Sequence, residues 1–151
     1  MSEGEAADRQ ACAERSAAAL YAADRASQAL GMRITAIAPY ECAVTMSVRP
    51  DMLNGHANCH GGVIFALADS AFAFACNSDG VPTVSASSSI DYLVAARQGD
   101  ELTATARRLW GGGRSALYEV TVVNQRGTQV ALFRGRSHRR APNGAPSQER
   151  K

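Results

Sequence analysis

The chain has 151 residues, of which 16 are basic and 14 acidic, for a formal net charge of +2. This length suits one domain with its own core, and the charge balance lacks the basic stripe of a nucleic-acid-binding protein. No stretch offers the roughly 20 apolar residues of a spanning helix, and the first residues do not resemble a signal peptide. We therefore expect a cytoplasmic protein that binds neither nucleic acid nor membrane.

The first elements in chain order are a helical arm and two strands. Ala, Arg, Glu and Gln predominate in residues 5–30, which predicts a helix with a break near Asp24 and an end at Gly31. Alternating apolar residues in 32–37 and 42–48 predict two strands joined by a short turn. Residues 50–59 have no period and predict a loop.

The stretch NCHGGVIFALADSAFAFACNS, residues 58–78, predicts the central element of the fold. Its length favours a helix over a strand, and Ala, Leu and Phe recur around every face. Such a helix should be enclosed by the rest of the domain.

The remaining chain is strand-like. Turns at 97–100, 111–113 and 126–127 separate the predicted strands, which span 83–93, 101–110, 115–125 and 129–136. Consecutive strands with tight turns predict an antiparallel meander, and the triple glycine at 111–113 reads as a hairpin turn. Residues 139–151 are rich in Pro, Gly and charge, which predicts a disordered tail.

These elements predict an α+β fold, in which a curved antiparallel sheet of about five to six strands wraps around one long helix. Residues 1–138 would form this single domain, with residues 1–30 as its helical arm. Because one such sheet leaves an open edge and part of the helix uncovered, we expect a homo-oligomer, at least a dimer.

Two glycines stand where the apolar helix begins. The first N–H groups of a helix have no partner within it and carry the positive end of its dipole, so Gly61 and Gly62 can present donors to a carbonyl that becomes negative during acyl transfer. The alternative is that they only make a sharp turn into the helix.

Asp69 is a carboxylate in the middle of the same apolar run. Burying it without partners costs several kcal/mol, which indicates either catalysis or a structural cap or ion pair. Gly61 and Asp69 are about 12 Å apart along a helix axis, so they cannot both reach one reacting atom from the same chain. If both act on one carbonyl, Asp69 must come from a second subunit.

A metal site is the competing chemistry for this segment. His56 and His60 stand in HxxxH spacing beside Cys59, but this is only half of a zinc site, and we expect no metal and no other cofactor. The four cysteines lack CxxC spacing, so we interpret them as reduced core residues rather than nucleophiles or disulfides.

The segment MLNGHANCHGGVIFALADSAFAFACNS, with SSIDYL and ALFRGRSHR downstream, resembles the PaaI subgroup of hot dog thioesterases from about Ala19 to Arg139. The specific part is HGG with an aspartate eight residues after its first glycine. The chain has Val94-Ala95-Ala96 where many members of the subgroup have Arg-Pro.

This resemblance implies an enzyme that hydrolyses aryl- or hydroxyaryl-acetyl-CoA, with coenzyme A as part of the substrate and dimers that pair into tetramers. It implies that the Gly61 N–H polarises the thioester carbonyl, that His60 and Asn54 orient the carbonyl or the loop, and that Asp69 of the facing subunit is nucleophile or general base. Ser85 would orient water.

Further residues are candidates for substrate binding. They are Gly62 beside the donor, and Met52, Leu53, Phe72 and Tyr92 as an apolar slot for the acyl group, although Phe72 suits plain core packing equally well. The alternatives are a non-catalytic acyl-CoA-binding protein on the same fold and a thioesterase for other medium-chain acyl-CoAs.

Overall fold

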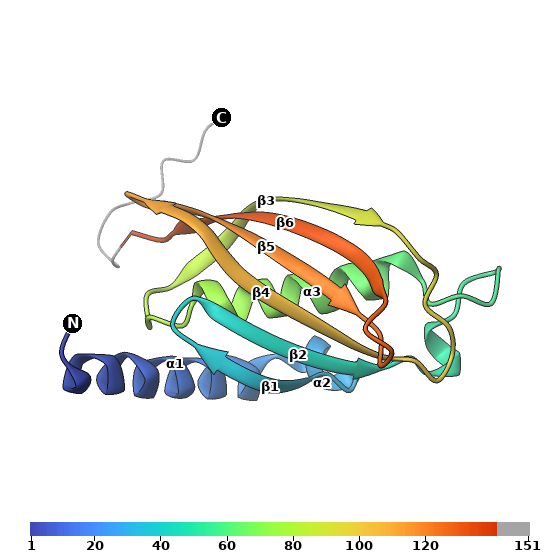
Figure 1. Ribbon diagram of the computed structural model, residues 1–151, viewed down its shortest axis with the longest axis horizontal. Coiled ribbons are helices and arrows are strands. Elements are labelled where there is room, and N and C mark those ends of the chain that lie inside the picture. The colour runs from blue at the N-terminus through green and yellow to red at the C-terminus, as the bar shows by residue number, and fades with distance from the viewer. Residues whose placement is uncertain (142–151) are drawn as a thin grey trace.

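The structure, a computed structural model, describes residues 1–141. It contains a helical arm, a central helix and one sheet (Figure 1). The helices are α1 (Glu3–Ala23), α2 (Arg25–Ala29) and α3 (Gly61–Cys76), with a short 3-10 helix at Pro50–Met52. The strands are β1 (Arg33–Ala38), β2 (Glu41–Ser47), β3 (Thr83–Tyr92), β4 (Glu101–Gly112), β5 (Ser115–Val123) and β6 (Gln129–Arg139).

The six strands form one antiparallel sheet in the order β1-β2-β4-β5-β6-β3. The α+β fold with a sheet around one helix is therefore confirmed, and β4, β5 and β6 form the predicted meander. The meander prediction is wrong for β3, which pairs with β6 instead of β4 and lies at the edge of the sheet. Residues 93–100 cross from that edge to β4, because eight residues are too many for the tight hairpin that the turn signal suggested.

The inner face of the sheet packs on α3 (Figure 1). Phe72 of α3 is buried, and its ring lies 5.3 Å from that of Tyr118 and 5.8 Å from that of Phe133. Gly135 of β6 makes this packing possible, since a Cβ there would lie 2.8 Å from the Phe72 ring. The sheet thus approaches α3 most closely where it has no side chain.

The helical arm has the predicted break. Asp24 separates α1 from α2 and caps α2 by accepting a hydrogen bond from the N–H of Ser27 at 2.9 Å. The Ser27 hydroxyl also donates to Asp24 and lies 2.9 Å from the hydroxyl of Ser70 in α3. The arm is therefore fastened to the central helix beside Asp69.

The C-terminal strand extends further than its sequence pattern indicated. β6 continues to Arg139, whose guanidinium pairs with the Asp79 carboxylate. Residues 142–151 of the predicted tail lie outside the described residues. Among residues 1–141, no helix is both long enough and apolar enough to cross a membrane.

Candidate active site at the head of the central helix

The first turn of α3 leaves one backbone donor free. His60 is the N-cap, and its Nδ1 accepts a hydrogen bond from the Gly62 N–H at 2.9 Å. The N–H groups of Val63 and Ile64 donate to the His60 carbonyl. Within residues 1–141 only the Gly61 N–H of this turn has no acceptor. The helix dipole adds positive potential there, so a developing oxyanion would be stabilised.

The loop before α3 is held by Asn54. Its Oδ1 accepts from the N–H of His56 at 2.9 Å and from the N–H of Asn58 at 3.2 Å, and the two backbones bond directly as well. The loop is also bridged to the segment after β3, since the Cys59 N–H donates to the Ala96 carbonyl at 2.8 Å. Asn54 therefore orients the loop within this chain.

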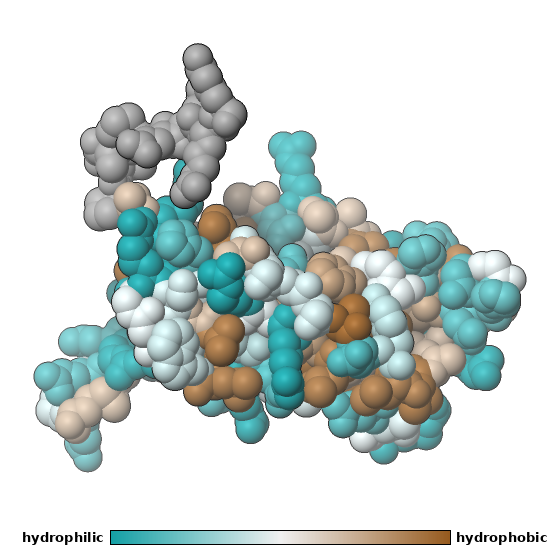
Figure 2. Space-filling model, turned by 90° about the horizontal axis from the view of Figure 1, so that it is seen from above, coloured by the Kyte–Doolittle hydropathy of each residue, from teal (hydrophilic) through white to brown (hydrophobic). Residues whose placement is uncertain are grey.

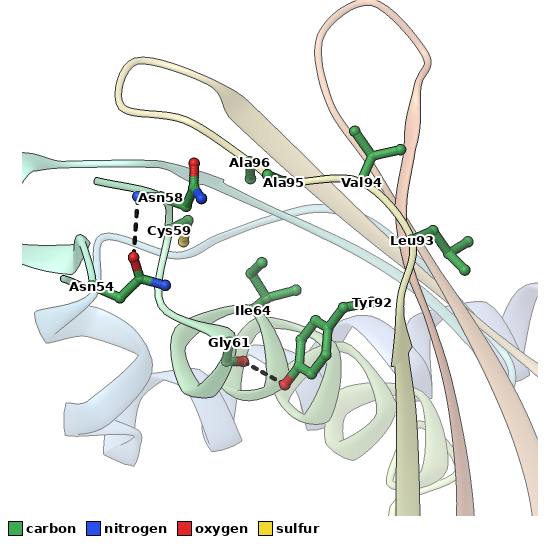
Figure 3. A pocket seen from close by; sticks show the side chains of 10 residues that line it. All are labelled: Asn54, Asn58, Cys59, Gly61, Ile64, Tyr92, Leu93, Val94, Ala95 and Ala96. Carbon is green, nitrogen blue, oxygen red and sulfur yellow. Dashed lines mark hydrogen bonds between the residues drawn. The ribbon is translucent and has the colours of Figure 1, made fainter. Parts of the chain in front are cut away.

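A cavity of about 350 Å³ opens at this helix end, between the loop and the segment that follows β3 (Figure 3). It brings together three of the predicted residues, Asn54, Gly61 and Tyr92. Its other lining residues are Asn58, Cys59, Ile64, Leu93, Val94, Ala95 and Ala96. None of these residues was among the predicted site residues, although the apolar run Leu93–Ala96 beyond the end of β3 was a signal in the sequence.

Tyr92 closes one side of the cavity against α3 (Figure 3). Its hydroxyl donates to the Gly61 carbonyl at 2.8 Å. A Cβ on Gly61 would lie 3.1 Å from the Tyr92 ring and hydroxyl, so any other residue there would require Tyr92 to shift by a few tenths of an ångström. Loss of solvent around the ring raises the pKa of Tyr92 above its ordinary value.

Asp69 lies two turns further along α3, away from the cavity lining. It is half-buried, and its carboxylate has no hydrogen-bond or ion-pair partner among residues 1–141. Burial raises the pKa of this carboxyl. The structural cap or ion pair considered from the sequence is absent from the described chain, and Gly61 and Asp69 do not meet within one subunit.

The remaining predicted residues occupy other places. Ser85 is exposed on β3 at a register shift, and its hydroxyl lies 3.1 Å from that of Ser88. Leu53 is half-buried and pairs with Cys59 across the loop. Met52 and Phe72 are buried in the core, and neither lines the cavity.

The structure also shows where the side chains considered for a metal site or a nucleophilic thiol lie. Cys59 is buried, and desolvation together with the charge of Asp100 raises its thiol pKa to about 11, which opposes a nucleophilic role. The Nδ1 of His60 is occupied as a helix cap. Within the described range 1–141, no three His, Cys, Asp or Glu residues gather as metal ligands.

The thioesterase superfamily matches residues 56–131 of the chain. Acyl-coenzyme A thioesterase PaaI of Escherichia coli strain K12 is 46% identical over 125 residues, which cover 83% of this chain and 89% of that protein. The solved structure of the E. coli PaaI protein from the phenylacetic acid degradation operon has a TM-score of 0.86 at 45% identity, and the match covers 87% of this chain and 96% of that chain.

A more distant structure, a hypothetical thioesterase protein with coenzyme A from Streptococcus pneumoniae TIGR4, has a TM-score of 0.70 at 27% identity. The match covers 75% of this chain and 88% of that chain. Two further structures of a hypothetical thioesterase from that strain are an aspartate-to-alanine and a threonine-to-alanine mutant, at positions 16 residues apart.

The sheet around α3, the free N–H at the start of that helix and the similarity to known proteins together define the class. The chain belongs to the thioesterase superfamily and has its hot dog fold. Within that superfamily it is an acyl-coenzyme A thioesterase of the PaaI type.

Proposed function

We propose that the substrates are aryl-acetyl-CoA thioesters of the phenylacetyl-CoA or hydroxyphenylacetyl-CoA type, which the enzyme hydrolyses to the free acid and coenzyme A in aromatic acid catabolism. The observation that carries this proposal is the free Gly61 N–H beside a cavity with an apolar wall. Tyr92, Leu93 and Val94 of that wall are 51%, 54% and 47% exposed in the single chain, so they offer apolar surface to an aromatic acyl group. The origin of the E. coli relative in a phenylacetic acid degradation operon supports the choice.

In the proposed reaction the Gly61 N–H donates to the thioester oxygen as negative charge develops there. Asp69 of the partner subunit attacks the carbonyl carbon or removes a proton from the water that attacks it. The C–S bond breaks, and the thiolate of coenzyme A takes up a proton that the water supplies. If water attacks, the acid leaves with the water oxygen; if Asp69 attacks, it forms a mixed anhydride, which water then hydrolyses to release the acid and restore the Asp69 carboxylate. Burial raises the pKa of Asp69, and a carboxylate with a raised pKa suits the base because it binds a proton more strongly than an exposed one.

Ser85 is proposed as the residue that orients the water. The support comes from spacing: Asp69 and Ser85 are separated by 16 positions, as are the aspartate and threonine that are mutated in the S. pneumoniae thioesterase. Serine and threonine carry the same hydroxyl. A register shift of β3 next to Ser85 is the kind of irregularity that re-aims a side chain beside an active site.

The proposed assembly is a dimer formed along β3, with two dimers pairing into a tetramer. β3 is an edge strand of ten residues. Most of these residues are exposed in the single chain, and the exposed ones lie on both faces of the strand. Figure 2 looks down on this side, where hydrophobic and near-neutral residues are interspersed with strongly hydrophilic ones. Asp69 and its half-buried neighbours Phe65, Ala66 and Ala73 form a stripe on α3 that a second subunit would cover.

A turnover panel tests the substrate class. Purified protein is assayed with phenylacetyl-CoA, hydroxyphenylacetyl-CoA and alkyl-CoA thioesters of several lengths, with Asp69→Asn as the comparison. We expect the highest kcat/KM for the aryl-acetyl thioesters and loss of most turnover in Asp69→Asn. A preference for medium-chain alkyl thioesters would overturn the substrate assignment, and an Asp69→Asn variant as fast as the parent would overturn the role of Asp69.

A further inference from the structure

The peptide plane between Gly61 and Gly62 is held at both of its ends. The Tyr92 hydroxyl donates to its carbonyl oxygen at 2.8 Å, and its N–H donates to the His60 Nδ1 at 2.9 Å (Figure 3 shows the Tyr92 bond). His60 caps α3, whereas Tyr92 is the last residue of β3, 31 positions after Gly61. One side chain from a distant strand therefore restrains the turn that contains the free donor.

Such a restraint matters because the backbone of Gly61 cannot fix the direction of its own N–H. Glycine has more accessible backbone conformations than any other residue, and the first N–H of a helix has no intrahelical bond to hold it. A β-carbon that would limit this freedom would lie 3.1 Å from Tyr92 and would press on its ring. The same Tyr92 contact that favours glycine at this position also restrains it through the hydrogen bond to the Gly61 carbonyl.

The backbone of Tyr92 is itself held in place by hydrogen bonds to β6. Tyr92 pairs with Ala131 of β6, and the N–H of the next residue, Leu93, donates to the Val130 carbonyl at 2.9 Å. The ring is thus carried by a strand that is anchored in the sheet, although half of its own surface is exposed. Its hydroxyl bond, rather than burial, fixes it over α3.

We propose that Tyr92 is a positioning residue. By holding the Gly61–Gly62 peptide, it restrains the backbone at the Gly61 Cα and so fixes the direction of the Gly61 N–H, which belongs to the adjoining His60–Gly61 peptide, toward the substrate carbonyl. This inference rests on the proposed role of Gly61 as the oxyanion donor. Tyr92 would then increase kcat by orienting the oxyanion donor, in addition to lining the cavity wall.

Tyr92→Phe tests the inference, since it keeps the ring and removes only the hydroxyl. The matched control is Tyr21→Phe. The Tyr21 hydroxyl also donates to a backbone carbonyl, that of Met32 at 2.6 Å, and neither residue lines the cavity. Both variants are assayed with the best substrate of the panel. We expect kcat to fall on the order of tenfold in Tyr92→Phe with KM nearly unchanged, and no such fall in Tyr21→Phe.

A spectroscopic readout separates positioning from a general structural effect. The probe is a ketone analogue of the substrate in which a methylene replaces the thioester sulfur, and the measurement is the infrared stretching frequency of its bound carbonyl. Parent and Tyr21→Phe should lower this frequency by the same amount, and Tyr92→Phe by less.

An unchanged kcat and carbonyl frequency in Tyr92→Phe would overturn the inference, as would a change in KM alone. Failure of the proposed substrate class is recognised separately, because it appears as poor aryl-acetyl turnover by the parent, and the Tyr92 comparison then proceeds with whichever acyl-CoA the parent prefers.

Discussion

Asp69 illustrates how a residue that is unfavourable for the fold can suit a proposed catalytic role. Its half-buried carboxylate has no partner in the described chain, and burial raises its pKa. A charged group in such a place destabilises the folded state relative to a neutral one. The residue is therefore a site where stability and activity should change in opposite directions.

Asp69→Asn should make the protein more stable at pH 7, by roughly 0.5–2 kcal/mol, while removing activity. The sign follows from linkage: a folded-state pKa above the unfolded value favours folding fully below the unfolded pKa, and this contribution is lost as pH rises through the folded pKa. The gain from Asn should accordingly shrink as pH falls and Asp69 of the parent becomes protonated. Urea midpoints of the parent and of Asp69→Asn, determined at several pH values from 4 to 8, measure this difference in stability.

Asp8→Asn is the control, because Asp8 is an exposed carboxyl on α1. This variant should show no such pH-dependent gain in stability. A less stable Asp69→Asn at neutral pH would mean that the carboxylate has a favourable partner, which the described chain does not supply.

Single residues differed in how well the sequence predicted them. Gly61 and Asp69 were placed correctly at the head and in the middle of α3, because helix position follows from local spacing. The bond from Tyr92 to Gly61 joins residues 31 positions apart, and no local pattern carries that information. Phe72 and Met52 are apolar whether they face a core or a ligand, so composition cannot separate the two roles.

At the scale of elements, the contact between α3 and β6 sets how closely the sheet approaches the helix. Gly135 faces Phe72 at a separation that leaves no room for a methyl group. Because Phe72 and Asp69 lie on the same helix, any shift of α3 at this contact also moves Asp69.

Gly135→Ala should destabilise the protein by about 1–3 kcal/mol, since the new Cβ would lie 2.8 Å from the Phe72 ring and force repacking. Gly55→Ala is the matched control, because nothing lies within 4 Å of a Cβ there. The free energy of unfolding from urea titration measures both. A Gly135→Ala variant as stable as the control would show that the sheet yields at little cost.

The order of the strands shows where element-level prediction stopped. Periodicity identified all six strands to within a few residues, yet it placed β3 beside β4. A strand's neighbours depend on the path of the chain through space, and residues 93–100 carry β3 to the far edge of the sheet. The same segment lines the cavity, so the missed crossover and the missed lining residues have one cause.

At the scale of the whole molecule, the proposed site needs two subunits. Gly61→Pro removes the donor with little change to the helix, because proline is favoured at the first helical position and lacks the N–H. His60 before it is extended, at φ −61° and ψ 134°, a conformation that a following proline tolerates. Gly61→Ala, which keeps the N–H, controls for the contact with Tyr92.

Mixing Gly61→Pro and Asp69→Asn subunits should restore activity. Each variant alone should be nearly inactive, but a mixed dimer contains one site with an intact Gly61 from one subunit and an intact Asp69 from the other. Random pairing of equal amounts should return about a quarter of the parent activity. Activity after denaturation and refolding of the mixture measures it. No recovery, with mixed dimers shown by mass spectrometry, would mean that each site uses groups from a single chain.

The two margins of the sheet differ in one further respect. β1 is a six-residue strand with an irregular register, it lies against α1, and the Gln10 side chain donates to its Ile37 carbonyl at 2.9 Å. β3, at the opposite margin, has no such cover among residues 1–141. Backbone pairing through β3 would use up the one accessible template, so the subunits would form a closed pair and further copies could not add to it as a growing fibre.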